Sequence, residues 1–133
     1  MPVIDLQKLS DGRTISYSRS TEMMTYTEAN TWCTEQNGNL PIPISLEENN
    51  FLSDIGSTWL GLNMEDVNNF TYTNWACAGE SCEPSGDGTR VQLIVGERWT
   101  HDWGHGGWND QHDTGDSLVT CYLSIKGKIK MIS

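Results

Sequence analysis

The chain has 133 residues, a length that suits one compact domain and is too short for two independent cores. Its formal net charge of −10 disfavours nucleic acid as a partner, because a phosphate backbone is bound through Lys and Arg and the chain has only 8 of them. No apolar run approaches the roughly eighteen residues that a membrane span needs, so we expect one soluble domain over residues 1–133.

Four cysteines in a chain rich in Trp and Gly indicate two disulfides and an extracellular location. The sequence has no C-x-x-C pair that would suggest a zinc ribbon. No apolar segment follows Met1 as it would in a signal peptide, so we expect this chain to be the mature form of a secreted protein. The alternative is a cytosolic protein with four reduced, buried thiols.

Two short amphipathic helices are predicted in the first half, after a strand at residues 13–20 ("RTISYSRS"). Thr25 stands three residues before Glu28, a capping-box spacing, and apolar residues then recur at helical spacing. Ser45 and Glu48 repeat this spacing at the start of the second helix. We expect the helices to end at the glycines that follow, Gly38 and Gly56.

The second half contains short β-like runs separated by segments rich in Gly, Asn and Asp. The runs lie at residues 58–62 ("TWLGL"), 70–75 ("FTYTNW"), 90–95 ("RVQLIV") and 118–125 ("LVTCYLSI"). Residues 75–90 and 96–108 are predicted to be long loops, and such loops are usually functional where they are ordered. Two helices followed by small sheets with long loops indicate an α+β fold.

Five segments, taken in order, resemble the C-type lectin-like domain. They are "YTEANTWCTEQNGNLPIPISLEENNFL" at 26–52, "WLGL" at 59–62, "EPS" at 83–85, "WND" at 108–110 and "VTCYL" at 119–123. Each motif is weak alone, but the ordered set spans most of the chain. The resemblance implies a C-type lectin-like fold, in which two helices pack on small antiparallel sheets beside a calcium-binding region of long loops. It also implies that residues 1–133 form a single carbohydrate-recognition domain.

A primary Ca²⁺ site, built from the "EPS" and "WND" motifs and completed by vicinal hydroxyls of a sugar, is a further implication of the resemblance. Ca²⁺ takes six to eight oxygen ligands, and these segments offer side-chain oxygens and a backbone carbonyl that leave about two positions open. In this family the Pro of the first motif usually follows a cis peptide bond, which X-Pro bonds alone adopt readily. The expected metal ligands are Glu83, Ser85, Asp87, Asn109 and Asp110.

The sugar is expected to contact Glu83, Ser85, Asn109 and Asp110, because a side chain that binds the metal can also hydrogen-bond a sugar hydroxyl. A tryptophan in the glycine-rich segment 96–110 ("GERWTHDWGHGGWND") could stack on the apolar face of a galactose. Trp103 is the first candidate and Trp99 the second. We therefore expect a galactose-type glycan ligand, with mannose and fucose as alternatives. Both tryptophans could instead fill a small core of the loop itself.

Two departures from the family pattern support an alternative, a calcium-independent lectin-like domain that binds a protein or another surface. Ser85 replaces the Asn of the "EPN" form of the motif, and a hydroxyl is a weaker Ca²⁺ ligand than an amide carbonyl. The position of a further family Glu falls on or near Gly88, where Asp87 is the nearest acid. In the blandest alternative the acidic loop binds nothing, because Asn, Asp and Gly are common in any turn.

The resemblance implies a disulfide between Cys33 and Cys121, which would stabilise the fold by about 4 kcal/mol in the chain-entropy model. Cys77 and Cys82 are then left to pair locally across "AGES". The second disulfide of the family is absent. Arg90 and Asp113 fall on its two cysteine positions, and we expect an ion pair there.

Catalysis and zinc binding are both less well supported than Ca²⁺ binding. No nucleophile and base stand in a recognisable arrangement, so we expect a binding protein and not an enzyme. His101 and His105 would need a helix to share a Zn²⁺ ion, and their segment is too rich in glycine for one. The expected partners are glycans, and pairing of domains in a homo-oligomer would raise avidity.

Overall fold

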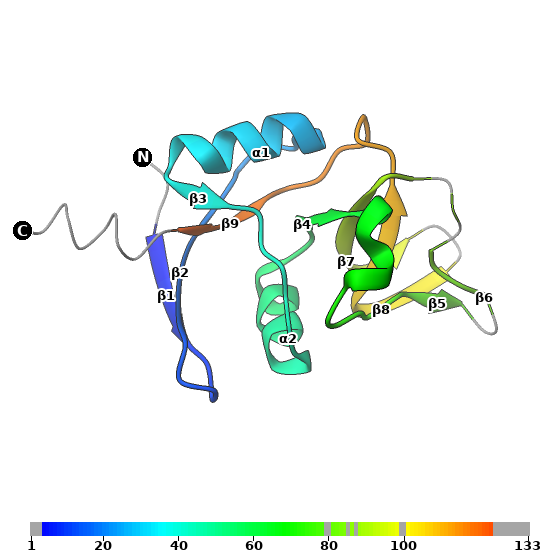
Figure 1. The fold of residues 1–133 in the computed structure, drawn as a ribbon, viewed down its shortest axis with the longest axis horizontal. Coiled ribbons are helices and arrows are strands. Elements are labelled where there is room, and N and C mark those ends of the chain that lie inside the picture. The colour runs from blue at the N-terminus through cyan, green and yellow to red at the C-terminus, as the bar shows by residue number, and fades with distance from the viewer. Residues whose placement is uncertain (1–3, 79–80, 85, 87, 99–100, 124–133) are drawn as a thin grey trace, which may run out of the picture.

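The computed structural model describes residues 4–78, 81–84, 86, 88–98 and 101–123, and within these ranges the chain forms an α+β domain. Two α-helices, a 3₁₀ helix and nine short strands follow one another along the chain (Figure 1). Their bounds are β1 Ile4–Lys8, β2 Thr14–Arg19, α1 Tyr26–Glu35, β3 Gly38–Asn39, α2 Leu46–Ile55, β4 Thr58–Asn63, η1 Met64–Asn69, β5 Cys77–Ala78, β6 Ser81–Cys82, β7 Arg90–Arg98, β8 His101–Gln111 and β9 Thr120–Leu123.

The strands form three antiparallel sheets in the described part of the chain. The first has the order β1-β2-β9-β3 and joins the beginning of the chain to its last strand. The second has the order β4-β7-β8, and the third is the small hairpin β5-β6. Helix α1 lies against the first sheet, and α2 lies between the first and second sheets (Figure 1). This arrangement confirms the predicted fold class.

Helix α1 begins as predicted and ends at Glu35, before the expected Gly38. Thr25 accepts a hydrogen bond from Glu28 N, and the Glu28 carboxylate accepts one from Thr25 N, which is a complete capping box. Asn37, with φ of 60°, turns the chain out of the helix. Gly38 has a different role, because it belongs to β3, where a side chain would come within 2.5 Å of the Tyr122 carbonyl oxygen.

Helix α2 begins with half of the predicted capping box. Ser45 accepts a hydrogen bond from Glu48 N, but the Glu48 carboxylate binds elsewhere and accepts from Ile44 N at 3.1 Å. The same carboxylate is fully buried and also accepts hydrogen bonds from Arg13 at 2.8 Å and from the Tyr122 hydroxyl at 2.6 Å. It thereby joins α2 to the first sheet. Gly56 ends the helix as expected.

Two hydrophobic clusters form the core of the described part of the chain. The first lies between α1 and the first sheet and contains Ala29, Cys33, Leu40, Trp59, Val119 and Cys121. The second lies between α2 and the second sheet and contains Leu52, Leu60, Leu62, Val91, Leu93 and Trp108. The predicted helical periodicity is therefore confirmed, because the helix residues in these clusters are those at the expected apolar positions.

Two predictions for the second half are wrong. Residues 70–75 form no strand, because their aromatic side chains pack on other rings and only Trp75 makes a bridge, to Trp108. Residues 96–108 are mostly a hairpin in place of a long loop, since β7 and β8 pair as far as Arg98 and His101. The pairing is irregular near Val95, where the register shifts twice, and the glycines there disguised the strand.

Both expected disulfides are present. Cys33 of α1 bonds to Cys121 of β9, and Cys77 bonds to Cys82 across the β5-β6 hairpin. The ion pair expected between Arg90 and Asp113 does not form. The Arg90 guanidinium lies 4.0 Å from the centre of the Tyr26 ring, and the Asp113 carbonyl accepts a hydrogen bond from Tyr26 N. A cation–π contact and a backbone hydrogen bond therefore join these segments.

No helix among the residues that the structure describes is long and apolar enough to cross a bilayer.

Candidate functional site

The loop that follows β6 is tied to strand β8 by the carboxylate of Asp110. Asp110 is 2% exposed, and its Oδ2 accepts hydrogen bonds from Gly86 N at 2.9 Å and from Gly88 N at 3.2 Å. Gly86 has a φ of +89°, a conformation that favours glycine. The glycines that follow the "EPS" motif therefore lie beside the "WND" motif, although more than twenty residues separate them in the sequence.

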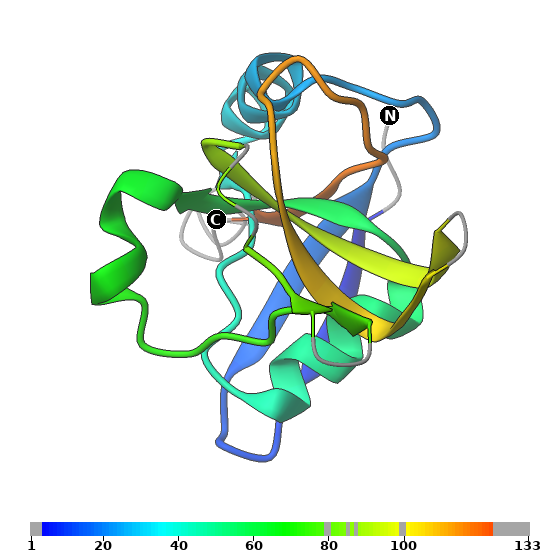
Figure 2. The same cartoon turned by 90° about the vertical axis from the view of Figure 1, so that its right-hand side faces the viewer.

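The position of Glu83 follows from its backbone. The peptide bond between Glu83 and Pro84 is cis, as the family resemblance implied. Glu83 N donates to the Ala76 carbonyl at 2.8 Å, and Ala76 N donates to the Trp108 carbonyl at 2.9 Å. Residue 76 thus lies between Glu83 and β8. Figure 2 shows the green segment of β5 and β6 beside the gold strand β8. The Cys77–Cys82 disulfide closes the hairpin immediately before Glu83.

A buried network of amides holds β8 in place next to this site. Trp108 is fully buried, and its indole Nε1 donates to Asn49 Oδ1 at 2.7 Å. Asn49 Nδ2 and Asn74 Nδ2 each donate to the Gly106 carbonyl at 3.0 Å. The segment from Gly106 to Trp108 is therefore fixed on α2 immediately before Asn109 and Asp110. Sequence reasoning missed Asn49, because in "EENN" it resembles an exposed helix residue.

The oxygen atoms of Glu83, Asn109 and Asp110 are of the kind that bind Ca²⁺, but the described residues supply only part of a coordination shell. Glu83 and Asn109 are partly exposed, Asp110 is buried, and carboxylate and amide oxygens are the ligands that Ca²⁺ takes in proteins. One oxygen of Asp110 is already hydrogen-bonded to two N–H groups. No group of three or more His, Cys, Asp or Glu side chains that could hold a metal ion occurs within the described ranges. The other two expected ligands, Ser85 and Asp87, lie outside those ranges.

Comparison with known proteins gives the family. Residues 22–123 match the family model described as the lectin C-type domain, which is more than half of the chain. The chain belongs to the C-type lectin domain family. The matched range includes every segment on which the resemblance was based, from the two helices to β9.

Relatives of this C-type lectin domain are similar over most of its length. Bovine (Bos taurus) E-selectin is 30% identical over 129 residues, which is 84% of this chain and 25% of the relative. The chain therefore spans a quarter of that relative's length. The mouse scavenger receptor C-type lectin carbohydrate-recognition domain has a TM-score of 0.64 at 20% identity, with 90% of this chain and 93% of that chain covered. A calcium-independent type II antifreeze protein has a TM-score of 0.66 at 18% identity, with 90% and 96% covered.

Gly88, on or near which we expected the position of a further family Glu, has no room for a side chain. A Cβ atom built on Gly88 would overlap the backbone of Gln111, which follows Asp110. The close approach of Gly88 to β8 allows its N–H to reach Asp110. An acidic ligand at this position is therefore incompatible with the backbone of this chain.

The other residues expected at the site are placed in part. Trp103 and the histidines His101 and His105 belong to β8, so the two histidines lie on a strand and not on a helix, but their side chains are outside the described part. Trp99 lies outside the described residues altogether. The roles of both tryptophans in stacking on a sugar stay predictions.

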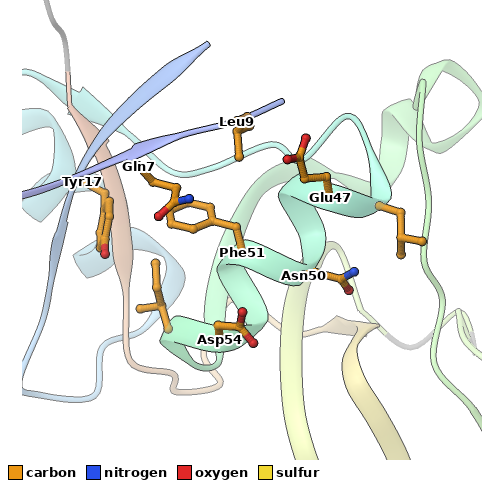
Figure 3. A pocket seen from close by; sticks show the side chains of 9 residues that line it. Gln7, Leu9, Tyr17, Glu47, Asn50, Phe51 and Asp54 are labelled. Carbon is orange, nitrogen blue, oxygen red and sulfur yellow. The ribbon is translucent and has the colours of Figure 1, made fainter. Parts of the chain in front are cut away.

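A hollow of about 690 Å³ lies elsewhere, between the β1-β2 hairpin and α2 (Figure 3). Tyr17 and Phe51 meet edge to face in its wall, with ring centres 5.2 Å apart. Two acidic residues line it, Glu47 and Asp54, and Glu47 already accepts hydrogen bonds from the backbone and hydroxyl of Ser10. This hollow is separate from the site formed by Glu83 and Asp110, because none of its lining residues belongs to residues 83–88 or β8.

Proposed function

We propose that this C-type lectin domain binds carbohydrate through a Ca²⁺ ion held between residues 83–88 and strand β8. The observation that carries the proposal is the contact of the Asp110 carboxylate with Gly86 N and Gly88 N. This contact brings the "EPS" loop, with its cis Glu83–Pro84 bond, against the strand that carries Asn109 and Asp110. In this proposal, Glu83 and Asn109 share one ion with Asp110.

Each residue has a role in the proposed site. Glu83 and Asn109 are partly exposed, so their oxygens can reach both a cation and a ligand from solvent. Asp110 supplies negative charge from a buried position and also orders the loop. Ser85 and Asp87 are proposed as further metal ligands. When bound, Ca²⁺ would supply a positive centre with open positions for two neighbouring sugar hydroxyls.

The proposed ligand is a terminal sugar of a glycan, of the galactose type ahead of mannose or fucose. The support is the presence of two tryptophans, Trp103 and Trp99, in the sequence segment that precedes Asn109. An indole could cover the apolar face of galactose, while the metal-binding side chains hold its hydroxyls.

An extracellular location and binding without catalysis complete the proposal. Two disulfides within one small domain favour an oxidising compartment. Pairing of domains would strengthen binding to a surface that carries many glycans.

The proposal is tested by calorimetric titration of Ca²⁺ into calcium-free protein, with a thermal melt of the same samples. A ligand that binds only the folded state stabilises it by about 2.7 kcal/mol at a hundredfold excess over its dissociation constant. A glycan array with Ca²⁺, repeated with a chelator, then identifies the sugar. The proposal is wrong if the titration shows no heat of Ca²⁺ binding and Ca²⁺ does not shift the melting midpoint. It is also wrong if glycan binding is unchanged by the chelator.

A calcium-independent lectin-like domain that binds a protein or another surface is the second candidate. It is favoured by Asp110, whose carboxylate is already hydrogen-bonded to two N–H groups of the loop that follows β6 and so has partners without a cation. The backbone at Gly88, which leaves no room for a further acidic ligand, supports it as well. The same thermal melt separates the candidates, because this one predicts a midpoint that Ca²⁺ does not change.

A further inference from the structure

A second cavity, of about 520 Å³, lies between the end of β2, the end of α2 and strand β7. This volume is in the range of small-molecule sites. The cavity contains a cationic side chain, Arg19, and apolar side chains that include Met23, Ile94 and Leu118. None of the residues that line it belongs to the proposed calcium site, so any ligand of this cavity would be independent of that site.

Arg19 is half-buried and has no acidic partner among the residues that the structure describes. Its Nη1 donates to the Ser57 carbonyl at 2.7 Å and to the Thr120 hydroxyl at 2.9 Å, and both acceptors are neutral. The ion pairs of the described residues involve Arg13 and not Arg19. Burial lowers the pKa of the Arg19 guanidinium, as expected for a cation without a counter-ion. Buried charges are normally paired, so an unpaired guanidinium in the wall of a cavity leaves a place for an anion.

The backbone makes room for this guanidinium. A Cβ atom at Gly56 would lie 2.7 Å from Arg19 Nη2, and Gly56 has a φ of +138°. A glycine is therefore required here both by the backbone conformation and by the close approach of the arginine. Nη1 is fully used by its two bonds, and Nη2 has no hydrogen-bond acceptor among the described residues. A planar guanidinium with free N–H groups matches the two oxygens of a carboxylate.

The other residues that line the cavity favour anions with one charge and an apolar body. Ile94 is 7% exposed and Met23 is 59% exposed, so an apolar wall extends from the interior to the rim. Asp116 also lines the cavity, and its carbonyl accepts a hydrogen bond from Gln92 Nε2 at 3.2 Å. The acidic side chain of Asp116 and the net charge of −10 oppose anions of high charge. A single negative charge on an apolar body fits these surroundings best.

We propose that the Arg19 cavity binds an organic monocarboxylate, with the carboxylate on the guanidinium and its apolar body against Met23, Ile94 and Leu118. Benzoate is a suitable probe, because it has one carboxylate and a flat apolar ring. Sulfate is the comparison, because it offers oxygens to Arg19 without an apolar body and with twice the charge.

The test is an NMR titration of the full chain with sodium benzoate in calcium-free buffer, repeated with Ca²⁺. We expect saturable shifts of the Arg19 Nε and Gln92 side-chain signals, with a dissociation constant on the order of 1 mM. Sulfate should bind at least several-fold more weakly. Wild-type protein without saturable shifts, or sulfate that binds as tightly as benzoate, would overturn the proposal. Because the first titration contains no Ca²⁺, its result does not depend on whether the proposed calcium site exists.

Two pairs of variants locate the ligand. Arg19→Gln should weaken benzoate binding at least tenfold, while Lys8→Gln, which removes the same charge from an exposed position, should change it less than twofold. Because Arg19→Gln also removes bonds to Ser57 and Thr120, a second pair leaves Arg19 intact. Met23→Glu places a competing carboxylate at the exposed rim and should weaken binding at least tenfold, while Met23→Gln loses only the apolar contact and should weaken it by a smaller factor. Equal binding by Met23→Glu and Met23→Gln contradicts the proposal.

Discussion

The indole of Trp108 donates its only N–H to the side-chain oxygen of Asn49, at 2.7 Å, in a part of the core where both residues are fully buried. Asn49 also donates to the Gly106 carbonyl. One amide on α2 therefore fixes both the backbone and the side chain of β8 at the point where the "WND" motif begins. The scaffold and the candidate site are connected through this residue.

Asn49→Leu is expected to destabilise the fold by about 2–3 kcal/mol, because the Trp108 N–H loses its partner in the dry core and Gly106 loses one of two donors. Chemical denaturation followed by Trp fluorescence measures the change. Asn50→Leu is the matched control, since Asn50 is the next residue and is exposed. Similar losses in both variants would mean that the buried amide has no special role.

Gly88→Ala is expected to weaken the contact between the loop and β8. The φ of Gly88 is not in the left-handed region, so the cost of this substitution comes from the overlap of the new methyl group with the Gln111 backbone. We expect a loss of about 1–3 kcal/mol and faster hydrogen exchange of Gly86 N and Gly88 N. Gly12→Ala, at a turn with open space around it, should cost about 1 kcal/mol from its φ of +95° alone and leave this loop unchanged.

Local signals in the sequence predicted the parts of the fold that depend on neighbours in the chain. The spacing of Thr25 and Glu28 predicted a capping box that the structure forms in full. The second box failed because Glu48 finds partners far away in the sequence, Arg13 and Tyr122, and no local pattern contains that information. The "EPS" and "WND" motifs were recognised because they occur along the chain in the same order as in the C-type lectin family.

The errors of sequence reasoning occurred where tertiary contacts override local preference. The aromatic run from Phe70 to Trp75 has high strand propensity, but Tyr72 and Trp75 both pack edge-on against Trp108. The glycines before Trp108 suggested a loop, but a strand tolerates them here because Gly106 lies against Asn49 and Ser53, where a side chain would not fit.

The buried hydroxyl of Tyr122 predicts a loss of stability in alkaline solution. Burial, followed by its hydrogen bond to the Glu48 carboxylate, raises the pKa of Tyr122 above its ordinary value. The folded state therefore keeps this proton at a pH where the unfolded chain, with a pKa near 10, releases it. The contribution of the protonated Tyr122 hydroxyl to the free energy of unfolding is complete below about pH 10. Above that pH it falls by up to about 1.4 kcal/mol per pH unit.

Tyr122→Phe removes this dependence, so its stability should approach that of the wild type as the pH rises above 10. Urea denaturation at several values from pH 8 to 11 measures the difference. The variant is less stable at pH 8 because Glu48 loses a donor. Parallel curves for the two proteins across this range would show that Tyr122 does not titrate as described.

Asp110→Asn separates the structural role of this carboxylate from its proposed role as a metal ligand. The amide keeps an oxygen that can accept from Gly86 N and Gly88 N, but the charge is gone, so we expect a loss of about 1–2 kcal/mol without calcium. If Ca²⁺ binds here, the calcium-dependent rise in the melting midpoint should disappear in this variant. Asp66→Asn, at an exposed position of η1, is the control and should retain the rise. A rise that persists in Asp110→Asn would place the ion elsewhere, and no rise in any of the three proteins would favour the calcium-independent domain.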